Sequence, residues 1–235
     1  MHILYANQVR PADLTPEQRK FLEGLKGAAG GIVVMDDRSS AHCVKDFDAA
    51  QDWVTAFFDK GAEEVLGYYA DEFVWEDIEF KQTITTKEEL YKAFVVFNNS
   101  GPDSPFGTHR FEVLRYDGGP AGHHRAVTRK SNELPPTWTR EEFQPLADQI
   151  LLGSHLDYDE WGVLQWVWKA QHNSDFFGIP AAGQSHTTRG ITFQRYKNGK
   201  IVHCQTHWNF RDAAIQLGVI PPPDEAWRNN PGLAQ

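Results

Sequence analysis

Three side chains of this sequence have the chemistry needed to move a proton near neutral pH. His172 lies at the end of an expected strand, and an imidazole ordinarily titrates close to neutrality. Glu76 and Asp77 follow Trp75, and a carboxyl group buried beside an indole has a raised pKa, which makes it a stronger base. Because side chains alternate along a strand, only one of two consecutive carboxylates can face a pocket. We therefore expect His172 to act in catalysis together with Asp77 or Glu76.

The other histidines and the cysteines point less clearly to chemistry. His203 and His207 are four residues apart on an expected strand, which places them about 13 Å apart, too far to share one metal ion. The histidines near residues 123 and 155 could join a metal site, but no standard zinc spacing occurs. Cys43 and Cys204 could pair, although two free buried thiols are the simpler interpretation. We expect neither a metal nor a cofactor.

Length and composition limit the class of protein. The chain has 235 residues, of which 40% are hydrophobic and 13% aromatic, enough for one large domain with a real core. The net charge of -9 argues against a nucleic-acid partner. No apolar run approaches the roughly 20 residues of a membrane helix, and the N-terminus lacks the pattern of a signal peptide. We expect a cytoplasmic protein that binds neither nucleic acid nor membrane.

The elements that must position these residues fall into two groups. Helix signals come first: Asp48 can cap a helix that ends at Gly61, a short helix follows, and Thr86 begins another with a capping box. A strand is expected at 73–80. From residue 108 onward the hydrophobic period is two, which predicts strands at 109–116, 160–172, 185–197 and 200–210. This order predicts an α+β fold, with helices on one face of a sheet.

Two segments fall outside this pattern. Residues 1–45 are expected to form an N-terminal extension, and residues 46–235 the main domain. An insertion at about 118–157 separates two strands and contains a second capping box at Thr139. About forty residues is too long for a simple loop, so we expect the insertion to be structured and to cover the mouth of a pocket.

The C-terminal half of the chain carries several short motifs in an ungapped order. With these motifs, and with residues 66–77, the chain resembles the SnoaL-like polyketide cyclases of the NTF2-like superfamily over roughly 46–117 and 158–228. The motifs are Phe177-Gly178-Ile179-Pro180, Arg189-Gly190-Ile191, Arg195-Tyr196 with Asn198-Gly199-Lys200-Ile201, and Gln216-Leu217-Gly218.

The resemblance implies a cone-shaped fold in which a curved antiparallel sheet wraps around N-terminal helices and encloses a deep apolar pocket. Members of this group are commonly homodimers that pair through the sheet. They include cofactor-free cyclases, isomerases, lyases and hydrolases that act on small hydrophobic molecules, and others only bind ligands. The position of Asp77 in the family pattern favours it over Glu76.

The turn at Asn198-Gly199 allows two registers for the last two strands. A two-residue loop would pair residue 197 with 200, whereas a three-residue loop would pair 196 with 200. In the related cyclases, the positions of Thr192 and Thr206 hold a histidine and an aspartate that work on one face. We therefore prefer the three-residue loop, which places Thr192 and Thr206 on one face as diagonal neighbours.

This register predicts the lining of the pocket. The tryptophans would form a wall suited to a flat polycyclic or terpenoid ligand, and the threonines would hydrogen-bond to it. The opposite face would be solvated or would form a dimer. The residues expected to contact substrate are Thr192, Thr206, Trp166, Trp168, Trp208, His186 and Gln194, with Val202 and Cys204 on the same face.

The sequence thus predicts a cofactor-free enzyme that performs cyclase-, isomerase- or lyase-type proton transfer. Its substrate would be a hydrophobic, carbonyl-containing small molecule such as a polyketide. A threonine hydroxyl cannot replace a histidine or an aspartate as an acid or base near neutral pH. A non-catalytic small-molecule-binding protein on the same fold is therefore an alternative. A limonene-type epoxide hydrolase is another, but Arg189 and Arg195 are expected to point away from the pocket.

Overall fold

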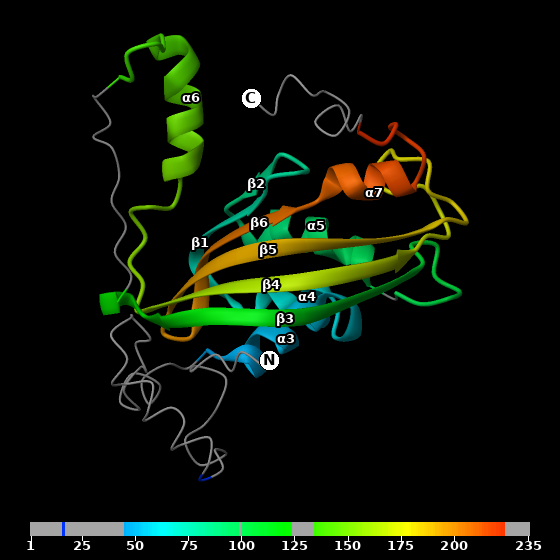
Figure 1. The fold of residues 1–235 in the computed structure, drawn as a ribbon. Helices are drawn as coiled ribbons and strands as arrows, with labels where there is room; N and C mark the ends of the chain where they lie inside the picture. Colours follow the sequence, from blue (N-terminus) through cyan, green and yellow to red (C-terminus); the bar gives the residue numbers. More distant parts are fainter. Residues whose placement is uncertain (1–15, 17–44, 99, 124–133, 224–235) are drawn as a thin grey trace.

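A curved six-stranded sheet forms the centre of the fold (Figure 1). The computed structural model describes residues 16, 45–98, 100–123 and 134–223, so most of the expected N-terminal extension lies outside the described residues. The strand order is β2-β1-β6-β5-β4-β3, and every neighbouring pair is antiparallel except β1 and β6, which run parallel. The strands are β1 Tyr69–Asp77, β2 Gln82–Ile84, β3 Thr108–Pro120, β4 Glu160–Gln171, β5 Ser185–Lys197 and β6 Lys200–Trp208.

Helices from the N-terminal part of the domain cover one face of this sheet (Figure 1). This arrangement confirms the predicted α+β fold, in which a curved sheet wraps around N-terminal helices. Each of the described helices is too short or too polar to span a bilayer. The helices are α3 Phe47–Asp59, α4 Ala62–Leu66, α5 Lys87–Phe94, α6 Arg140–Leu151 and α7 Phe210–Gln216, with short 3-10 turns at η2 Val95–Phe97 and η3 Ala121–His123.

The helix starts follow the capping signals, with one correction. Asp46, not Asp48, caps α3, because its carboxylate accepts a hydrogen bond from the backbone N–H of Ala49 at 2.9 Å. Asp48 lies instead in the first turn, where its negative charge complements the helix dipole. The predicted caps at Thr86 and Thr139 are both confirmed.

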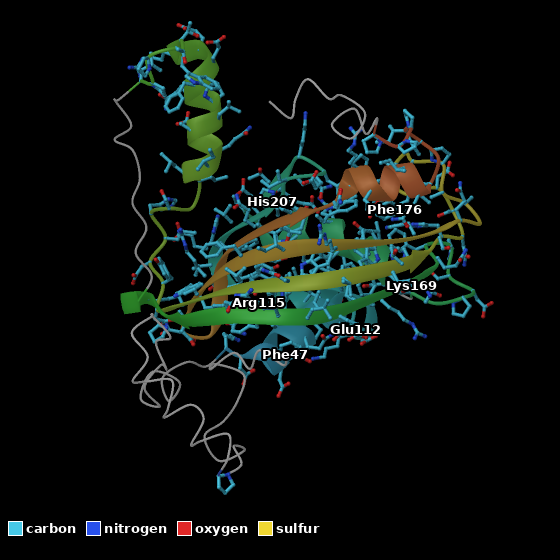
Figure 2. The ribbon with its side chains drawn as sticks, viewed as in Figure 1. Phe47, Glu112, Arg115, Lys169, Phe176 and His207 are labelled. Carbon is cyan, nitrogen blue, oxygen red and sulfur yellow. The ribbon has the colours of Figure 1, made fainter. Side chains whose placement is uncertain are left out.

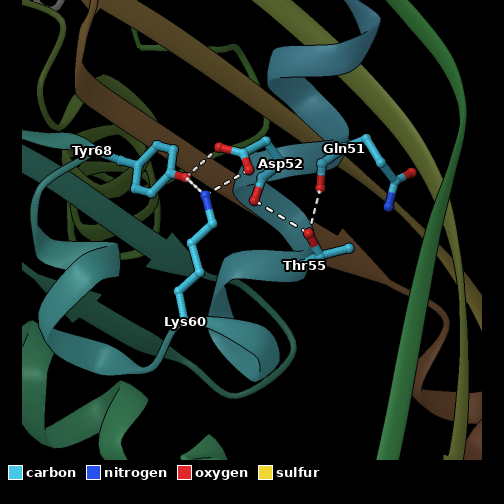
Figure 3. Close-up of polar contacts among 5 residues, drawn as sticks. All are labelled: Gln51, Asp52, Thr55, Lys60 and Tyr68. Carbon is cyan, nitrogen blue, oxygen red and sulfur yellow. Dashed lines mark hydrogen bonds and ion pairs between the residues drawn. The ribbon is translucent and has the colours of Figure 1, made fainter.

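Polar contacts tie α3 to its surroundings. The side-chain amide of Gln51 accepts from the backbone N–H of Val113 at 2.7 Å and donates to the carbonyl of Phe111 at 3.3 Å, both on β3. The Lys60 ammonium, directly after α3, contacts the Asp52 carboxylate at 2.6 Å and the Tyr68 hydroxyl at 3.0 Å (Figure 3). Tyr68 directly precedes β1, so these contacts fix the start of the strand that carries Asp77.

The hairpin between β5 and β6 corrects the predicted register. Lys197 pairs with Lys200, and both turn residues are left-handed, Asn198 with φ 49° and Gly199 with φ 73°, so the loop has two residues and not three. A register shift then follows between Arg195 and Tyr196. The extra residue of this bulge is Val202 on β6. It shifts the pairing by one residue, which has the same effect on the faces as the additional turn residue of the predicted loop.

The bulge preserves most of the predicted faces. Thr192 lies directly opposite Thr206, not diagonal to it as predicted, and Gln194 lies opposite Cys204. The register therefore differs from the predicted one by two residues, so these four side chains still share the inner face as predicted. Val202 does not, because it sits at the bulge and packs with Val74 on the outer side. The alternation in β4 is also as predicted, since Leu164, Trp166, Trp168 and Ala170 are all buried on the inner face.

The described residues of the insertion, 118–123 and 134–157, do not line the cavity between the sheet and the helices. Helix α6 buries none of its residues and stands away from the sheet (Figure 1). The turn after it packs Leu152 and Leu156 against Val74 on the outer face. For these residues the lid prediction is wrong, because the insertion joins β4 at Glu160, whereas the loop with Phe176 and Phe177 that borders the cavity follows the other end of β4.

The outer face of the sheet is mixed in character. Lys169 and Glu112 are exposed on it (Figure 2), and Ile191 is 39% exposed. Such a face is compatible with water or with a second copy of the chain, and pairing through the sheet remains a prediction.

Candidate active site

A cavity of about 100 Å³ lies between the inner face of the sheet and helices α3, α5 and η2. Aromatic rings dominate its wall. Two small apolar residues, Val54 and Ala93, and four polar residues, Asp77, Gln82, Thr192 and Thr206, complete it. The aromatic residues of the wall are Trp53, Phe57, Phe58, Trp75, Phe80, Phe94, Phe97, Phe111, Trp166, Trp168, Phe176, Phe177 and Trp208.

Asp77 is the one ionisable side chain among the described residues of this wall. It ends β1 and is only 8% exposed. Its carboxylate accepts from the backbone N–H of Phe80 at 3.0 Å, and both oxygens lie 3.3 Å from the indole N–H of Trp208. Burial raises the pKa of Asp77, and these hydrogen bonds offset only part of the effect. Within the described ranges, no cationic side chain forms an ion pair with it.

Thr192 and Thr206 form a hydrogen-bonded pair next to Asp77. Their hydroxyl oxygens are 3.0 Å apart, and the indole N–H of Trp166 donates to Thr192 Oγ1 at 3.0 Å. Because Thr192 already accepts from Trp166, its own proton can be donated to Thr206, which leaves the Thr206 proton for a ligand. Asp77 and Thr206 are direct partners in the β1–β6 ladder, so a base and a hydroxyl donor stand side by side.

The predicted base His172 does not line the cavity. It is 1% exposed, and its Nε2 lies 3.0 Å from Nδ1 of His186, which is likewise absent from the wall. The two rings stack with centroids 5.0 Å apart. The ring of Phe176, which does line the cavity, packs 4.8 Å from the ring of His172. The prediction that these two histidines face the ligand is therefore corrected.

A third histidine, His109, extends this buried cluster. The indole N–H of Trp168 donates to its Nδ1 at 3.2 Å, so its proton is on Nε2, which donates to the carbonyl of Phe106 at 3.2 Å. Burial lowers the pKa of His172, and it lowers the pKa of His109 and His186 to about 4. All three rings are therefore neutral at physiological pH, and they support the wall rather than supply charge to it.

Glu76 and Gln194 are also buried away from the cavity. Glu76 accepts from the side-chain amide of Gln205 at 3.0 Å and lies 3.8 Å from Nε2 of His203. Gln194 accepts from the Tyr196 hydroxyl, and its amide nitrogen lies 3.7 Å from the thiol sulfur of Cys204. Of the predicted contact residues, the structure brings together Asp77, Thr192, Thr206, Trp166, Trp168 and Trp208.

Sequence reasoning missed the helical half of the wall. Trp53 and Phe57 recur at helical spacing, as do Phe94 and Phe97 near the end of α5, and this spacing indicates ordinary core packing. These residues line a cavity, and do not simply fill the core, because the curved sheet leaves a space beneath the helices. In the part of the chain that the structure describes, no group of three or more His, Cys, Asp or Glu residues could hold a metal ion.

Comparison with known proteins is consistent with the motifs. Residues 154–217 match the model of the SnoaL-like polyketide cyclase family, which confirms the resemblance over β4, β5, β6 and α7. No curated protein matches the chain.

Several solved structures resemble the chain at low sequence identity. AclR from Streptomyces galilaeus, described as a proposed hydroxylase, is 14% identical and covers 79% of this chain and 93% of its own, with a TM-score of 0.45. A proposed SnoaL-like polyketide cyclase from Shewanella putrefaciens is 9% identical and covers 82% and 98%, with a TM-score of 0.47. TsrD from Streptomyces laurentii is 12% identical and covers 75% and 99%, with a TM-score of 0.45.

Proposed function

We propose that this protein is a cofactor-independent enzyme that moves a proton next to the carbonyl group of a small hydrophobic molecule. The observation that carries the proposal is Asp77, a buried carboxyl group without an ionic partner among the described residues, in a mainly aromatic cavity. A raised pKa makes its carboxylate a stronger base than an exposed aspartate. The match to a family of polyketide cyclases supports a cyclase-type reaction.

In this mechanism, the Asp77 carboxylate removes a proton from the carbon next to the carbonyl. The electron pair of the broken C–H bond forms the C=C bond of an enolate, and negative charge develops on the carbonyl oxygen. The Thr206 hydroxyl donates a hydrogen bond to that oxygen. The enolate carbon then attacks a second carbonyl, which closes a ring, and Asp77 returns its proton to the new alkoxide. Alternatively, where the substrate is a β,γ-unsaturated ketone, the enolate is a dienolate, and Asp77 returns the proton to its γ-carbon, which moves the C=C bond next to the carbonyl and isomerises the substrate.

The surroundings of Asp77 favour this chemistry. The aromatic wall excludes water, and a hydrogen bond to a developing negative charge is stronger where water is absent. The Thr206 donor is held by Thr192, which in turn is held by the indole of Trp166. Hydrogen bonds in such a chain polarise one another, so the last hydroxyl is a better donor than an isolated threonine.

A non-catalytic ligand-binding protein is the second candidate. It is favoured by the threonines that stand at the acid and base positions of the related cyclases, because Asp77 then has no second titratable group beside it on the described wall. An epoxide hydrolase of the limonene type has less support. Its arginine has no counterpart on this wall, and the guanidinium of Arg195 lies 5.0 Å from the ring of Tyr158 instead.

Exchange of ketone α-protons into D₂O, followed by proton NMR, tests the proposal. We expect the wild-type protein to accelerate exchange in ketones that also raise its melting temperature. Asp77→Asn should still be stabilised by the same ketones but should lose the acceleration. Ketones that stabilise the wild-type protein and exchange no faster with it would establish the binding protein instead.

A further inference from the structure

The cavity is small for the molecules that a polyketide cyclase handles. Its volume is about 100 Å³. An apolar cavity of about 150 Å³ is known to take up benzene, so the space here is less than that needed by one aromatic ring. Within this volume, a ligand of two rings can be enclosed next to Asp77 only if part of the wall moves.

Phe177 is the part of the wall best able to move. It is 46% exposed, and every other described residue of the wall is buried or half-buried. Its ring packs 4.8 Å from the ring of Phe80 and 6.3 Å from that of Phe97, at the outer end of the cavity. Because nearly half of this side chain already faces solvent, its displacement breaks fewer apolar contacts than displacement of a fully buried residue of the wall would.

The backbone around Phe177 forms a tight two-residue turn. The backbone groups of Phe176 and Ile179 exchange two hydrogen bonds, each 2.9 Å long, and Phe177 and Gly178 between them have φ values of 47° and 82°. A phenylalanine is rarely found in this left-handed conformation, and such strain persists where surrounding contacts hold it. Here the two hydrogen bonds between Phe176 and Ile179 hold the turn, so the Phe177 side chain can rotate while the backbone keeps its left-handed conformation.

We propose that Phe177 plugs the entrance and sets the size of the substrate. Its ring occupies the outer part of the binding site, and an incoming ligand displaces it and takes its place against Phe80. The substrate class that fits is a flat molecule of two or more rings, with a carbonyl at its inner end near Thr206 and an apolar ring at its outer end. This inference rests on the proposed function only in that it treats the cavity as the substrate site.

Phe177→Gly removes the ring while keeping a residue suited to the left-handed turn. Phe177→Asn is a second variant for the case that the first does not fold. It also removes the ring, and asparagine tolerates the left-handed conformation better than most other residues. Ile191→Ala is the matched control, because it removes an exposed apolar side chain from the outer face of the sheet. None of these positions carries a group of the proposed catalytic machinery.

The first readout is acrylamide quenching of tryptophan fluorescence, which needs no ligand. Five tryptophans line the cavity, so an open entrance should raise the quenching constant at least about twofold in the Phe177 variants, while Ile191→Ala should resemble the wild type. Equal quenching in the wild type and the Phe177 variants would overturn the assignment of the entrance.

The second readout compares a one-ring ketone, acetophenone, with a two-ring ketone, acetonaphthone, by stopped-flow fluorescence. Removal of the plug should speed the association of acetonaphthone at least about tenfold and that of acetophenone less. Equal effects on both ketones, or none on either, would overturn the role in size selection. Both readouts leave Asp77 intact and require no turnover, so their failure is separate from a failure of the proton-transfer proposal.

Discussion

Asp77 and Glu76 are neighbours on one strand, yet the structure places them in different environments. Both carboxyl groups are buried, and burial raises the pKa of both. Asp77 faces a cavity and has an aromatic wall around it. Glu76 points to the other side of the sheet, where Gln205 and His203 fill the space beside it.

This difference shows that burial and a raised pKa do not by themselves identify an active residue. A carboxylate needs room for a substrate and a donor beside it as well as a suitable pKa. Asp77 has both, through the cavity and through Thr206. Glu76 has no room for a substrate, because Gln205 and His203 fill the space beside it, and the amide of Gln205 donates to Glu76 itself.

The largest expected effect separates the two carboxylates in catalysis. Asp77→Asn should lower the rate of proton exchange by about 10²–10⁴-fold, the usual contribution of a general base. Glu76→Gln should retain most of the rate. The rate of the wild type should fall as the pH is lowered through the raised pKa of Asp77, since only the carboxylate acts as a base. If Glu76→Gln abolished exchange and Asp77→Asn did not, the assignment of the two faces would be reversed.

The free energy of unfolding should depend more on side chains of the inner face of the sheet than on those of the outer face. Leu164→Ala removes a fully buried side chain from the inner face of β4 and should lower the free energy of unfolding by about 2–5 kcal/mol. Val163→Ala, one residue earlier on the outer face and only half-buried, should cost about 1 kcal/mol or less. Urea denaturation of both variants measures the difference, and similar losses would mean that the outer face is packed as tightly as the inner one.

The buried histidines should make the protein sensitive to acid. Folding lowers the pKa of His109 and His186 from 6.5 to about 4, so the unfolded chain takes up protons first as the pH falls. The stability that they contribute is complete above about pH 6.5 and is lost as the pH falls towards 4.

His186→Gln should weaken this loss, and His207→Gln, at an exposed position on the outer face, should leave it unchanged. Urea denaturation between neutral and mildly acidic pH provides the measurement. An identical pH dependence in His186→Gln and wild type would contradict the assignment. Asp77 and Glu76 act in the opposite sense, because a raised folded pKa contributes stability at low pH that is lost as the pH rises.

The smallest expected effect concerns the hydroxyl beside Asp77. Thr206→Val removes the proposed donor and should slow proton exchange by about 10–100-fold, in line with the loss of one hydrogen bond to a developing charge. Thr206→Ser restores the hydroxyl and should recover most of the rate. A rate in Thr206→Val equal to that of the wild type would remove Thr206 from the mechanism without affecting the role of Asp77.

Much of the scaffold was predictable because its signals are local. The alternation of hydrophobic and polar residues predicted the bounds of β4 and β5 to within one residue. The capping boxes predicted where α5 and α6 begin. The register of the hairpin between β5 and β6 was harder to predict. Asn198-Gly199 is compatible with a loop of two or of three residues, and the bulge that decides the register has no clear sequence signal. The inner faces were nevertheless predicted correctly for Thr192 and Thr206, because the bulge adds one residue where the turn lacks one.

The composition of the candidate site was less predictable. His172 has the right chemistry and the right face, but it lies beyond the last residue of β4, where the loop carrying Phe176 folds over it. Trp53, Phe94 and Phe177 reach the cavity from segments far apart in the chain, and no local pattern distinguishes a cavity wall from a filled core.

The sequence by itself determined the alternation that sends Asp77 and Glu76 to opposite sides of one strand, since that alternation is a property of the extended backbone. The tertiary structure alone decided which of the two carboxylates would face a cavity. That outcome depends on the curvature of the sheet, the helices beneath it and the insertion that packs on its outer face, all of which are set by contacts between distant parts of the chain.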